Sequence, residues 1–351
     1  MENRLNKVLI TISIVLCIVI IVIIVLGINK NNNKYDINNN KYDIDFYERL
    51  DDEIKVYSGE VLGEEINKVN AADKYISCIK SSVNEEELPD SVKNIINQIN
   101  EYYKRDKNYY SYKYVDTYTG FSVSINENQP IFTASTIKGP AAIYIYEMAE
   151  EGKINLDDIL TYTSKYYDNG GGILRFKNFN TTYSTKELLD YSITLSDNSA
   201  HMMLVDQYGR ENMMNFWQEK GTNTIFTKPY TQWGNNTAHD AAIYMNELYR
   251  YYQSNGTYSD LAMSEFLNAK KKILSAHNEY KIANKAGWWH EYKHDAAIVF
   301  AENPYIVVAF STLGSQYKGP FFNDISNLTY QLHTEYWKYK VDSCSRIEQY
   351  K

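Results

Sequence analysis

The stretch Ala134-Ser135-Thr136-Ile137-Lys138-Gly139-Pro140 places a serine and a lysine three residues apart, where a strand-like pattern gives way to a helix-like one. Because residues i and i+3 of a helix share a face, Ser135 and Lys138 are predicted to lie side by side. A partly desolvated lysine can lose its proton and activate a neighbouring hydroxyl as a nucleophile. The start of the helix would also bring backbone N–H groups near Ser135, where an oxyanion could form. The stretch therefore predicts a nucleophilic serine at a helix N-terminus.

The same Ser-x-x-Lys spacing also begins at Ser77 and at Ser315, so two further motifs must single out Ser135. Ser196-Asp197-Asn198 lies between two helix-like runs, where its serine could relay a proton and its asparagine could hydrogen-bond a substrate amide. Lys285-Ala286-Gly287 ends a strand-like run and offers a positive charge beside a residue without a side chain. Taken alone, the first motif is also typical of a helix N-cap, and the second of a surface lysine before a turn.

In this order and spacing, the three motifs resemble the active-site signature of serine β-lactamases and penicillin-binding proteins, and most closely that of class A β-lactamases. The resemblance extends over residues 89–340. The segments that look like the family's leading hairpin, its approach to the Ser-Asp-Asn loop, its Thr-Ala-x-Asp helix start and its strand after Lys-Thr-Gly are Ser111–Ile125, Gly171–Leu174, Thr181–Leu189, Asn236–Asp240 and His294–Val299. The resemblance implies an α/β (α+β) fold of the β-lactamase/transpeptidase type, with an antiparallel sheet flanked by helices and an inserted helical subdomain.

The resemblance also implies catalytic roles for four side chains. Ser135 would be the acylated nucleophile, and Lys138 its base or proton shuttle. Ser196 would pass the proton onward, and Lys285 would attract the substrate carboxylate. We therefore expect a serine hydrolase that acts through an acyl-Ser135 intermediate on β-lactams or D-Ala-D-Ala-like peptides. The resemblance implies no cofactor and no metal.

Four further residues would contact the substrate. Asn198 would hold its acylamino side, and the backbone N–H of Trp288, which follows Gly287, would complete the oxyanion hole with that of Ser135. Ala286 replaces the family's threonine and lacks the hydroxyl that would bind the substrate carboxylate, a hydrogen bond worth about 0.5–1.5 kcal/mol. Trp288 adds bulk at the opening of the site, which would either narrow the pocket or offer an apolar shelf.

A second departure from the family concerns deacylation. Class A β-lactamases carry a Glu-x-x-Leu-Asn motif between the Ser-Asp-Asn and Lys-Thr-Gly motifs, and its glutamate activates the hydrolytic water. The corresponding stretch Gly221–Asn236 contains no Asp or Glu, while Glu211 and Glu219 precede it in a helix-like run. We therefore expect weak deacylation, which leaves a DD-peptidase-like penicillin-binding protein or another cell-wall esterase or amidase as the alternative. A non-enzymatic alternative is a sensor that binds β-lactams or peptidoglycan fragments.

The N-terminal part of the chain predicts a membrane anchor. Residues 8–28 form an apolar run that, at about 1.5 Å per residue, can span a hydrocarbon core of roughly 30 Å. Arg4 and Lys7 favour a cytoplasmic N-terminus; a cleaved signal peptide is the alternative, but no small-x-small cleavage site follows. The predicted parts are a cytoplasmic tail at 1–7, the transmembrane helix at 8–28, a low-complexity tether and spacer at 29–88, the hydrolase domain at 89–340 and a tail at 341–351. The sequence thus predicts a single-pass protein of the cell membrane with an extracytoplasmic catalytic domain.

Composition limits the possible partners. The formal net charge is -8 and no block of Lys or Arg stands out, so a nucleic-acid partner is not expected. The polar heptapeptide at residues 31–37 is repeated at 38–44, which indicates a tether rather than a folded unit. Among three cysteines, Cys78 and Cys344 could form a disulfide in an oxidising compartment or remain free thiols. The oligomeric state stays open.

Hydrophobic periodicity predicts the regular elements of the domain. The expected helices are 92–99, 141–150, most of 151–252 and 325–339, and the expected strands are 110–115, 121–125, 131–133, 281–289, 296–301 and 305–312. His290-Glu291-Tyr292-Lys293-His294 matches the zinc-protease pattern His-Glu-x-x-His, which needs a helix to bring both rings to one metal. Because this segment lies between two strand-like runs, we expect a β-turn there instead.

Overall fold

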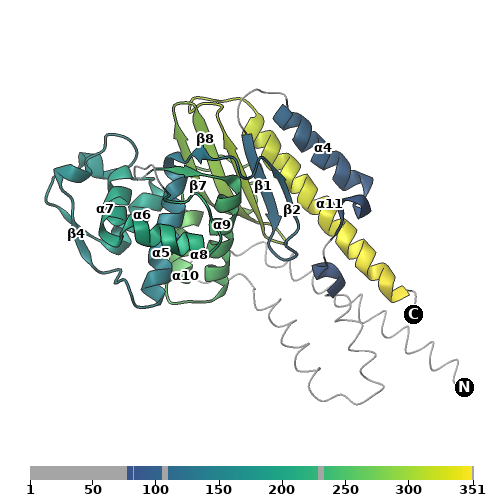
Figure 1. Ribbon diagram of the computed structural model, residues 1–351, viewed down its shortest axis with the longest axis horizontal. Helices are drawn as coiled ribbons and strands as arrows, with labels where there is room; N and C mark the ends of the chain where they lie inside the picture. The colour runs from purple at the N-terminus through teal and green to yellow at the C-terminus, as the bar shows by residue number, and fades with distance from the viewer. Residues whose placement is uncertain (1–76, 82, 105–109, 228–232, 350–351) are drawn as a thin grey trace, which may run out of the picture. The chain divides into compact units, whose positions relative to one another are not determined.

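The computed structural model describes residues 77–81, 83–104, 110–227 and 233–349 (Figure 1). The predicted transmembrane helix at 8–28 and the repeat tract after it lie outside the described residues. No helix within the described part of the chain is long and apolar enough to cross a membrane. The described residues cover nearly all of the predicted hydrolase domain.

A five-stranded antiparallel sheet, with strand order β2-β1-β9-β8-β7, forms the centre of this domain. Its strands are β1 (Tyr110–Asp116), β2 (Ser122–Ile125), β7 (Lys281–Trp289), β8 (Tyr292–Phe300) and β9 (Tyr305–Ser311). β1 pairs with β9, so the first and last strands of the described residues lie side by side. This arrangement confirms the predicted antiparallel sheet, whose N-terminal and C-terminal strands are separated in sequence by helices.

One face of the sheet is covered by two helices, α4 (Asp90–Lys104) and α11 (Phe321–Gln349) (Figure 1). Side chains alternate between the faces of a strand, so Tyr114 and its partner Val307 both point into the core under these helices. α11 continues through residue 340, where the domain was expected to end, so most of the predicted tail is helical.

The other face of the sheet carries the helices that build the site. α5 (Lys138–Glu150) is buried on nearly all sides, which explains why its sequence is apolar all round. The remaining helices are α6 (Thr185–Thr194), α7 (Asn198–Tyr208), α8 (Arg210–Glu219), α9 (Ala238–Gln253) and α10 (Ser259–Leu267) (Figure 1). They form the predicted helical subdomain inserted between the strands.

Several short elements complete the described domain. Two small antiparallel ladders pair β3 (Ile131–Phe132) with β6 (Asn235–Asn236), and β4 (Ile159–Thr161) with β5 (Thr182–Ser184). The 3-10 helices are η1 (Glu85–Glu87), η2 (Ala134–Ile137), η3 (Ser164–Tyr166) and η4 (Leu174–Phe176). The prediction that most of 151–252 is helical missed β4 and β5, because strands of three residues are too short to show a period.

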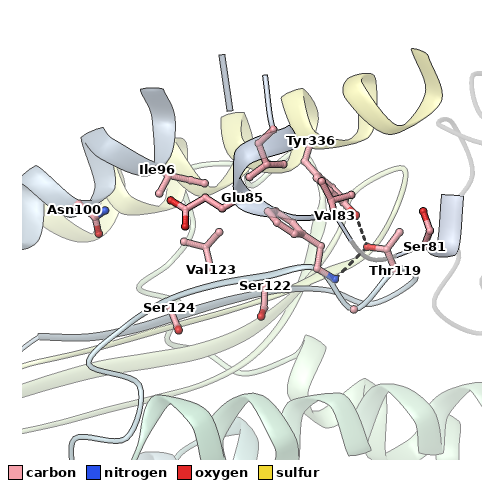
Figure 2. Close-up of a pocket in the computed structure, with 13 residues that line it drawn as sticks. Ser81, Val83, Glu85, Ile96, Asn100, Thr119, Ser122, Val123, Ser124 and Tyr336 are labelled. Carbon is pink, nitrogen blue, oxygen red and sulfur yellow. Dashed lines mark hydrogen bonds between the residues drawn. The ribbon is translucent and has the colours of Figure 1, made fainter. Parts of the chain in front are cut away.

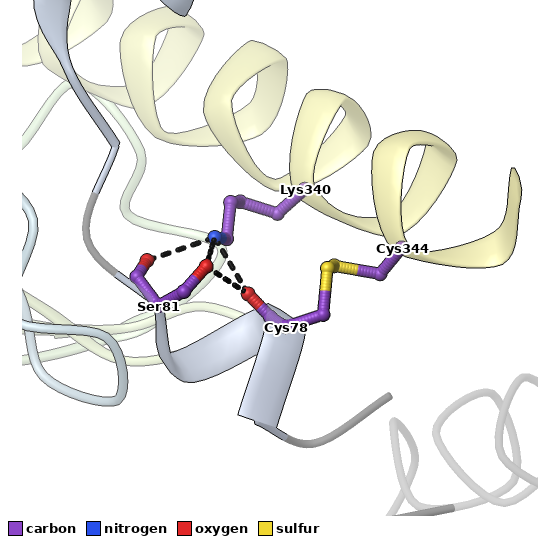
Figure 3. Close-up of a disulfide and its surroundings, with 4 residues drawn as sticks. All are labelled: Cys78, Ser81, Lys340 and Cys344. Atoms are coloured by element: carbon purple, nitrogen blue, oxygen red, sulfur yellow. Dashed lines mark hydrogen bonds between the residues drawn. A yellow bond between two sulfur atoms is a disulfide. The ribbon is translucent and has the colours of Figure 1, made fainter. Parts of the chain in front are cut away.

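A disulfide joins Cys78, before η1, to Cys344 near the end of α11 (Figure 3). Lys340 reinforces this junction: its Nζ donates to the backbone oxygens of Cys78 at 2.8 Å and of Ser81 at 2.9 Å. The pairing that the sequence left open is therefore formed. It fastens the end of the predicted spacer to the last helix of the domain.

The double variant Cys78→Ser/Cys344→Ser is expected to lose about 2–5 kcal/mol of unfolding free energy. The bridge closes a chain segment across a sequence separation of 266, so the unfolded chain gains much conformational freedom when the bridge is absent. Urea denaturation without reductant measures the difference, and reductant should shift the wild type toward the variant while leaving the variant itself unchanged. Equal midpoints for both proteins would contradict the expectation.

A pocket lies between the segment before α4, α4 itself and the edge strand β2 (Figure 2). Val123 of β2, Ile96 of α4 and Tyr336 of α11 contribute apolar lining, and Glu85 contributes a carboxylate. None of the site residues predicted from the sequence lines this pocket.

Candidate active site

Ser135 lies in η2, directly before α5. The preceding residue, Ala134, has a φ of 45°, a left-handed backbone conformation that residues other than glycine rarely adopt. Such strain costs on the order of 1 kcal/mol and persists where the surroundings impose it. Here the surroundings are a buried helix start and the adjoining strand β7, which together set the position of Ser135.

Lys138 is fully buried and forms the centre of the site. Its Nζ lies 3.0 Å from Ser135 Oγ and 3.2 Å from Ser196 Oγ. It also lies 2.7 Å from the backbone oxygen of Ser196 and 2.6 Å from Asn198 Oδ1. Burial lowers the pKa of Lys138 well below its ordinary value, and the nearby charge of Lys285 lowers this pKa further. The arrangement therefore favours a neutral amine within hydrogen-bonding distance of two serine hydroxyls.

The turn between α6 and α7 brings Ser196 and Asn198 to Lys138. Asp197 is the N-cap of α7, and its side chain accepts a hydrogen bond from Ala200 N at 3.0 Å. Its second oxygen accepts from the backbone N–H groups of residues 173 and 174 at 2.6 and 2.8 Å. Ser196 has a φ of 55°. Both interpretations of the motif therefore hold: the aspartate caps the helix, and its two neighbours face the lysine.

Lys285 approaches Ser196 from strand β7. Its Nζ lies 3.0 Å from Ser196 Oγ and 3.2 Å from the backbone oxygen of Ala286. Burial lowers the pKa of Lys285 to about 8, against the opposing effect of the Asp295 carboxylate. Two buried amines thus flank the Ser196 hydroxyl, and at neutral pH Lys285 is the protonated one.

Gly287 brings strand β7 into contact with the nucleophile segment. A Cβ added at this position would lie 2.6 Å from Ser135 N and 2.8 Å from Thr136 N, so only glycine fits. Trp288 follows and is 38% exposed, which leaves its ring at the surface beside the site. Ala286 is buried, and its carbonyl oxygen accepts a hydrogen bond from Lys285 Nζ.

The structure thus brings the side chains of five of the eight predicted residues into one hydrogen-bonded cluster, and the other three residues lie at the end of β7 next to it. The clustered residues are Ser135, Lys138, Ser196, Asn198 and Lys285.

Two residues of the site were not predicted from the sequence. Asp168 Oδ1 accepts from Asn198 Nδ2 at 2.8 Å and from Gly170 N at 2.7 Å. The ring of Trp233 lies with its centroid 5.2 Å from Lys138 Nζ. The signal that could have found Asp168 is its place two residues before the three glycines that lead to the Ser-Asp-Asn turn.

The first residues of the stretch that lacks a carboxylate are held against α9 by hydrogen bonds. Asp240 of α9 accepts from the backbone N–H groups of Asn223 and Thr224. Glu211 and Glu219 belong to α8, as predicted. The carboxylates that act electrostatically on Lys138 are instead those of Asp197 and Asp168, which belong to other segments.

The His-Glu-x-x-His match lies in the hairpin between β7 and β8, as expected from the flanking strands. Only His290 and Glu291 form the turn, and His294 is already inside β8. Both ring nitrogens of His294 are engaged: Nδ1 accepts from Ser311 N at 3.1 Å, and Nε2 donates to the backbone oxygen of Phe132 at 2.8 Å. Burial lowers the pKa of His294 to about 4, which keeps the ring neutral. This histidine ties β8 to the strand before Ser135.

An antiparallel sheet with an inserted helical subdomain, and a Ser-x-x-Lys pair with a buried lysine at their junction, define the β-lactamase/transpeptidase class of proteins. The model of the β-lactamase enzyme family matches residues 92–333, and the chain belongs to this family.

Solved structures agree with this assignment. PBP-A has a TM-score of 0.62 and 22% sequence identity, covering 70% of this chain and 96% of its own. A β-lactamase from Sphaerobacter thermophilus has a TM-score of 0.59 and 15% identity, covering 70% and 96%. An ancestral class A β-lactamase has a TM-score of 0.57 and 18% identity, covering 69% and 99%. At sequence identities this low, the structural similarity establishes the shared fold alone. No curated protein sequence matches the chain.

Proposed function

We propose that the chain is a serine hydrolase of the class A β-lactamase type that acts through an acyl-Ser135 intermediate on β-lactams or related amides, with slow deacylation. The observation that carries the proposal is the buried amine of Lys138, 3.0 Å from Ser135 Oγ and 3.2 Å from Ser196 Oγ. One amine in reach of two hydroxyls can take a proton from the first and return one through the second.

The hydrogen bonds of Lys138 give a direction to the first proton transfer. A neutral amine has two N–H donors and one lone pair. Its two shortest contacts, Asn198 Oδ1 at 2.6 Å and the Ser196 backbone oxygen at 2.7 Å, can only accept, so they take both donors. The lone pair is left for the hydroxyl proton of Ser135, which makes this serine the nucleophile.

Ser196 then completes the relay to the leaving group. The protonated Lys138 can donate to Ser196 Oγ, while Ser196 gives its own proton to the departing amide nitrogen. Lys285, at 3.0 Å on the other side, stabilises negative charge that develops on this oxygen and offers a positive charge to a substrate carboxylate. The backbone N–H groups of Ser135 and Trp288 would hold the oxyanion, because Gly287 lets β7 approach so closely.

Release of the acyl group is the slow step in this proposal. The loop at 221–236 holds no Asp or Glu to activate a water. This absence favours, as the second candidate, a DD-peptidase-like penicillin-binding protein or another cell-wall esterase or amidase. A mutant of PBP-A is described as an acyl-enzyme complex with penicillin G, which supports β-lactams as probes of the Ser135 site. A sensor that stays acylated, or that only binds its ligand, is the non-enzymatic candidate.

Intact mass spectrometry of the protein with a fluorescent penicillin separates these candidates. A transient adduct with loss of the drug supports β-lactamase activity, and a persistent adduct supports a penicillin-binding role. Ser135→Ala should form no adduct under the same conditions. If the wild type also forms none, neither β-lactam candidate holds and the substrate is another ester or amide.

The acylation rate is expected to have a bell-shaped dependence on pH. Lys138 acts as a base only when neutral, so the rate falls as pH drops through its lowered pKa. Lys285 acts when protonated, so the rate falls again as pH rises past about 8. Single-turnover adduct formation measured from about pH 5 to about pH 10 tests this expectation. A rate that keeps rising through the alkaline range would contradict the role of Lys285.

We also propose that the domain is held outside the cytoplasm by the apolar segment at residues 8–28. The Cys78–Cys344 disulfide supports an oxidising compartment, since disulfides are rare in the cytosol. Extraction of membranes from cells that express the full chain tests the anchor: the protein should need detergent. Release by high salt alone would exclude a spanning helix.

A further inference from the structure

Asn198, which holds the substrate amide in the proposed function, carries a carboxylate partner of its own. Its Oδ1 faces Lys138 Nζ, and its Nδ2 donates to Asp168 Oδ1 at 2.8 Å. An asparagine amide has two N–H bonds on Nδ2, and the second has no acceptor within the described part of the chain. That bond is free to donate to a substrate carbonyl, which would then lie within a few ångströms of Asp168.

The loop that carries Asp168 is built to hold it there. Gly170 N donates to the same Asp168 oxygen at 2.7 Å, and a Cβ at Gly170 would lie 2.5 Å from Asn198 Nδ2. A Cβ at Gly171 would lie 2.7 Å from the backbone oxygen of Ser196. Arg175 donates to the backbone oxygens of residues 169 and 170, so this cation braces the loop rather than pairing with Asp168. The loop therefore packs directly onto the Ser-Asp-Asn turn.

The second oxygen of this carboxylate is available to a ligand. Asp168 is only partly buried, and no donor to its Oδ2 occurs among the residues that the structure describes. A carboxylate with one oxygen held by two donors and the other open is a receptor for a cation.

We propose that Asp168 selects amide substrates that carry an ammonium group on the carbon next to the carbonyl of their acylamino side chain. Such a substrate would place its carbonyl on Asn198 Nδ2 and its ammonium on Asp168. The inference rests on the proposed acylation of Ser135 and adds the chemical class of the acyl side. It applies equally to a β-lactam and to a peptide with a free amine at this position.

Ampicillin and penicillin G test the proposal, because they differ by this one ammonium group. For each protein, the preference is the acylation rate with ampicillin divided by the rate with penicillin G. This ratio should be roughly 3- to 10-fold higher for the wild type than for Asp168→Asn. Dividing the two ratios cancels the different intrinsic reactivities of the drugs. Asp206→Asn is the matched control, since this exposed carboxylate lies near the other end of α7 and pairs with Lys165 at 2.8 Å. It changes the net charge equally and should keep the wild-type preference.

The outcomes separate this proposal from the proposed function. If neither drug forms an adduct with the wild type, acylation of Ser135 by β-lactams is refuted and the selectivity with it. If both drugs react and the preference is the same in Asp168→Asn, the selectivity alone is refuted, and Asp168 only orients Asn198. A second pair, a glycyl-D-alanyl thioester with its amine free or acetylated, carries the test to peptides. A preference for the acetylated member would contradict the proposal.

Discussion

Replacing Lys138 by methionine is expected to slow the acylation of Ser135 by about 10²- to 10⁴-fold, the usual contribution of a positioned general base. Methionine fills a similar volume but can neither take the Ser135 proton nor donate to Asn198 Oδ1 and the Ser196 backbone oxygen. The rate is measured as adduct formation with a fluorescent penicillin in a single turnover.

The control for this variant is Lys153→Met, an exposed lysine just beyond the end of α5. It makes the same change of side chain outside the site, and it should react at the wild-type rate. Thermal unfolding of both variants shows whether a slow reaction comes from the missing base or from loss of folded protein. Acylation of Lys138→Met at the wild-type rate, in a folded protein, would rule out this lysine as the base.

Replacing Gly287 by alanine is expected to lower the acylation rate by about 10²- to 10³-fold, comparable to the loss of one oxyanion-hole donor. The new Cβ would lie 2.6 Å from Ser135 N, 2.8 Å from Thr136 N and 3.1 Å from Thr133 O. These are backbone atoms, so β7 or η2 must move, and the donor pair loses its geometry. The same crowding is expected to remove about 1–3 kcal/mol of unfolding free energy.

Gly152→Ala is a suitable comparison for this second variant. Gly152 has a φ of 71° and open space where a Cβ would lie, so the substitution introduces only local strain of about 1 kcal/mol. It should therefore lose stability but keep the wild-type acylation rate. If Gly287→Ala behaves in the same way, the close approach of β7 has no part in catalysis.

The strength of the sequence pattern explains which parts of the fold were predictable. β7, β8 and β9 have seven to nine residues each, include apolar runs and are separated by short turns such as His290-Glu291, so they could be recognised as strands. The adjacency of Ser135 and Lys138 followed from helical spacing alone. Ser196 and Lys285 could be added only through the resemblance to a known family, because their contact with Lys138 depends on how α7 and β7 pack.

What the sequence did not predict depends on contacts between distant segments. Asp168 reaches Asn198 across 30 residues because three consecutive glycines let the loop lie against the turn. The pairing of Cys78 with Cys344 depends on α11 running back past the start of the domain. No local propensity encodes either contact.

The disulfide also determines how the domain would bear mechanical load. If residues before Cys78 connect to a membrane, tension on that segment passes through the sulfur bridge into α11 at Cys344. Lys340, one helical turn earlier, shares this load through its bonds to Cys78 and Ser81. The force therefore bypasses η1 and α4, which would otherwise be peeled from the sheet one turn after another. A domain fastened in this way can remain folded while tension acts on the segment before Cys78.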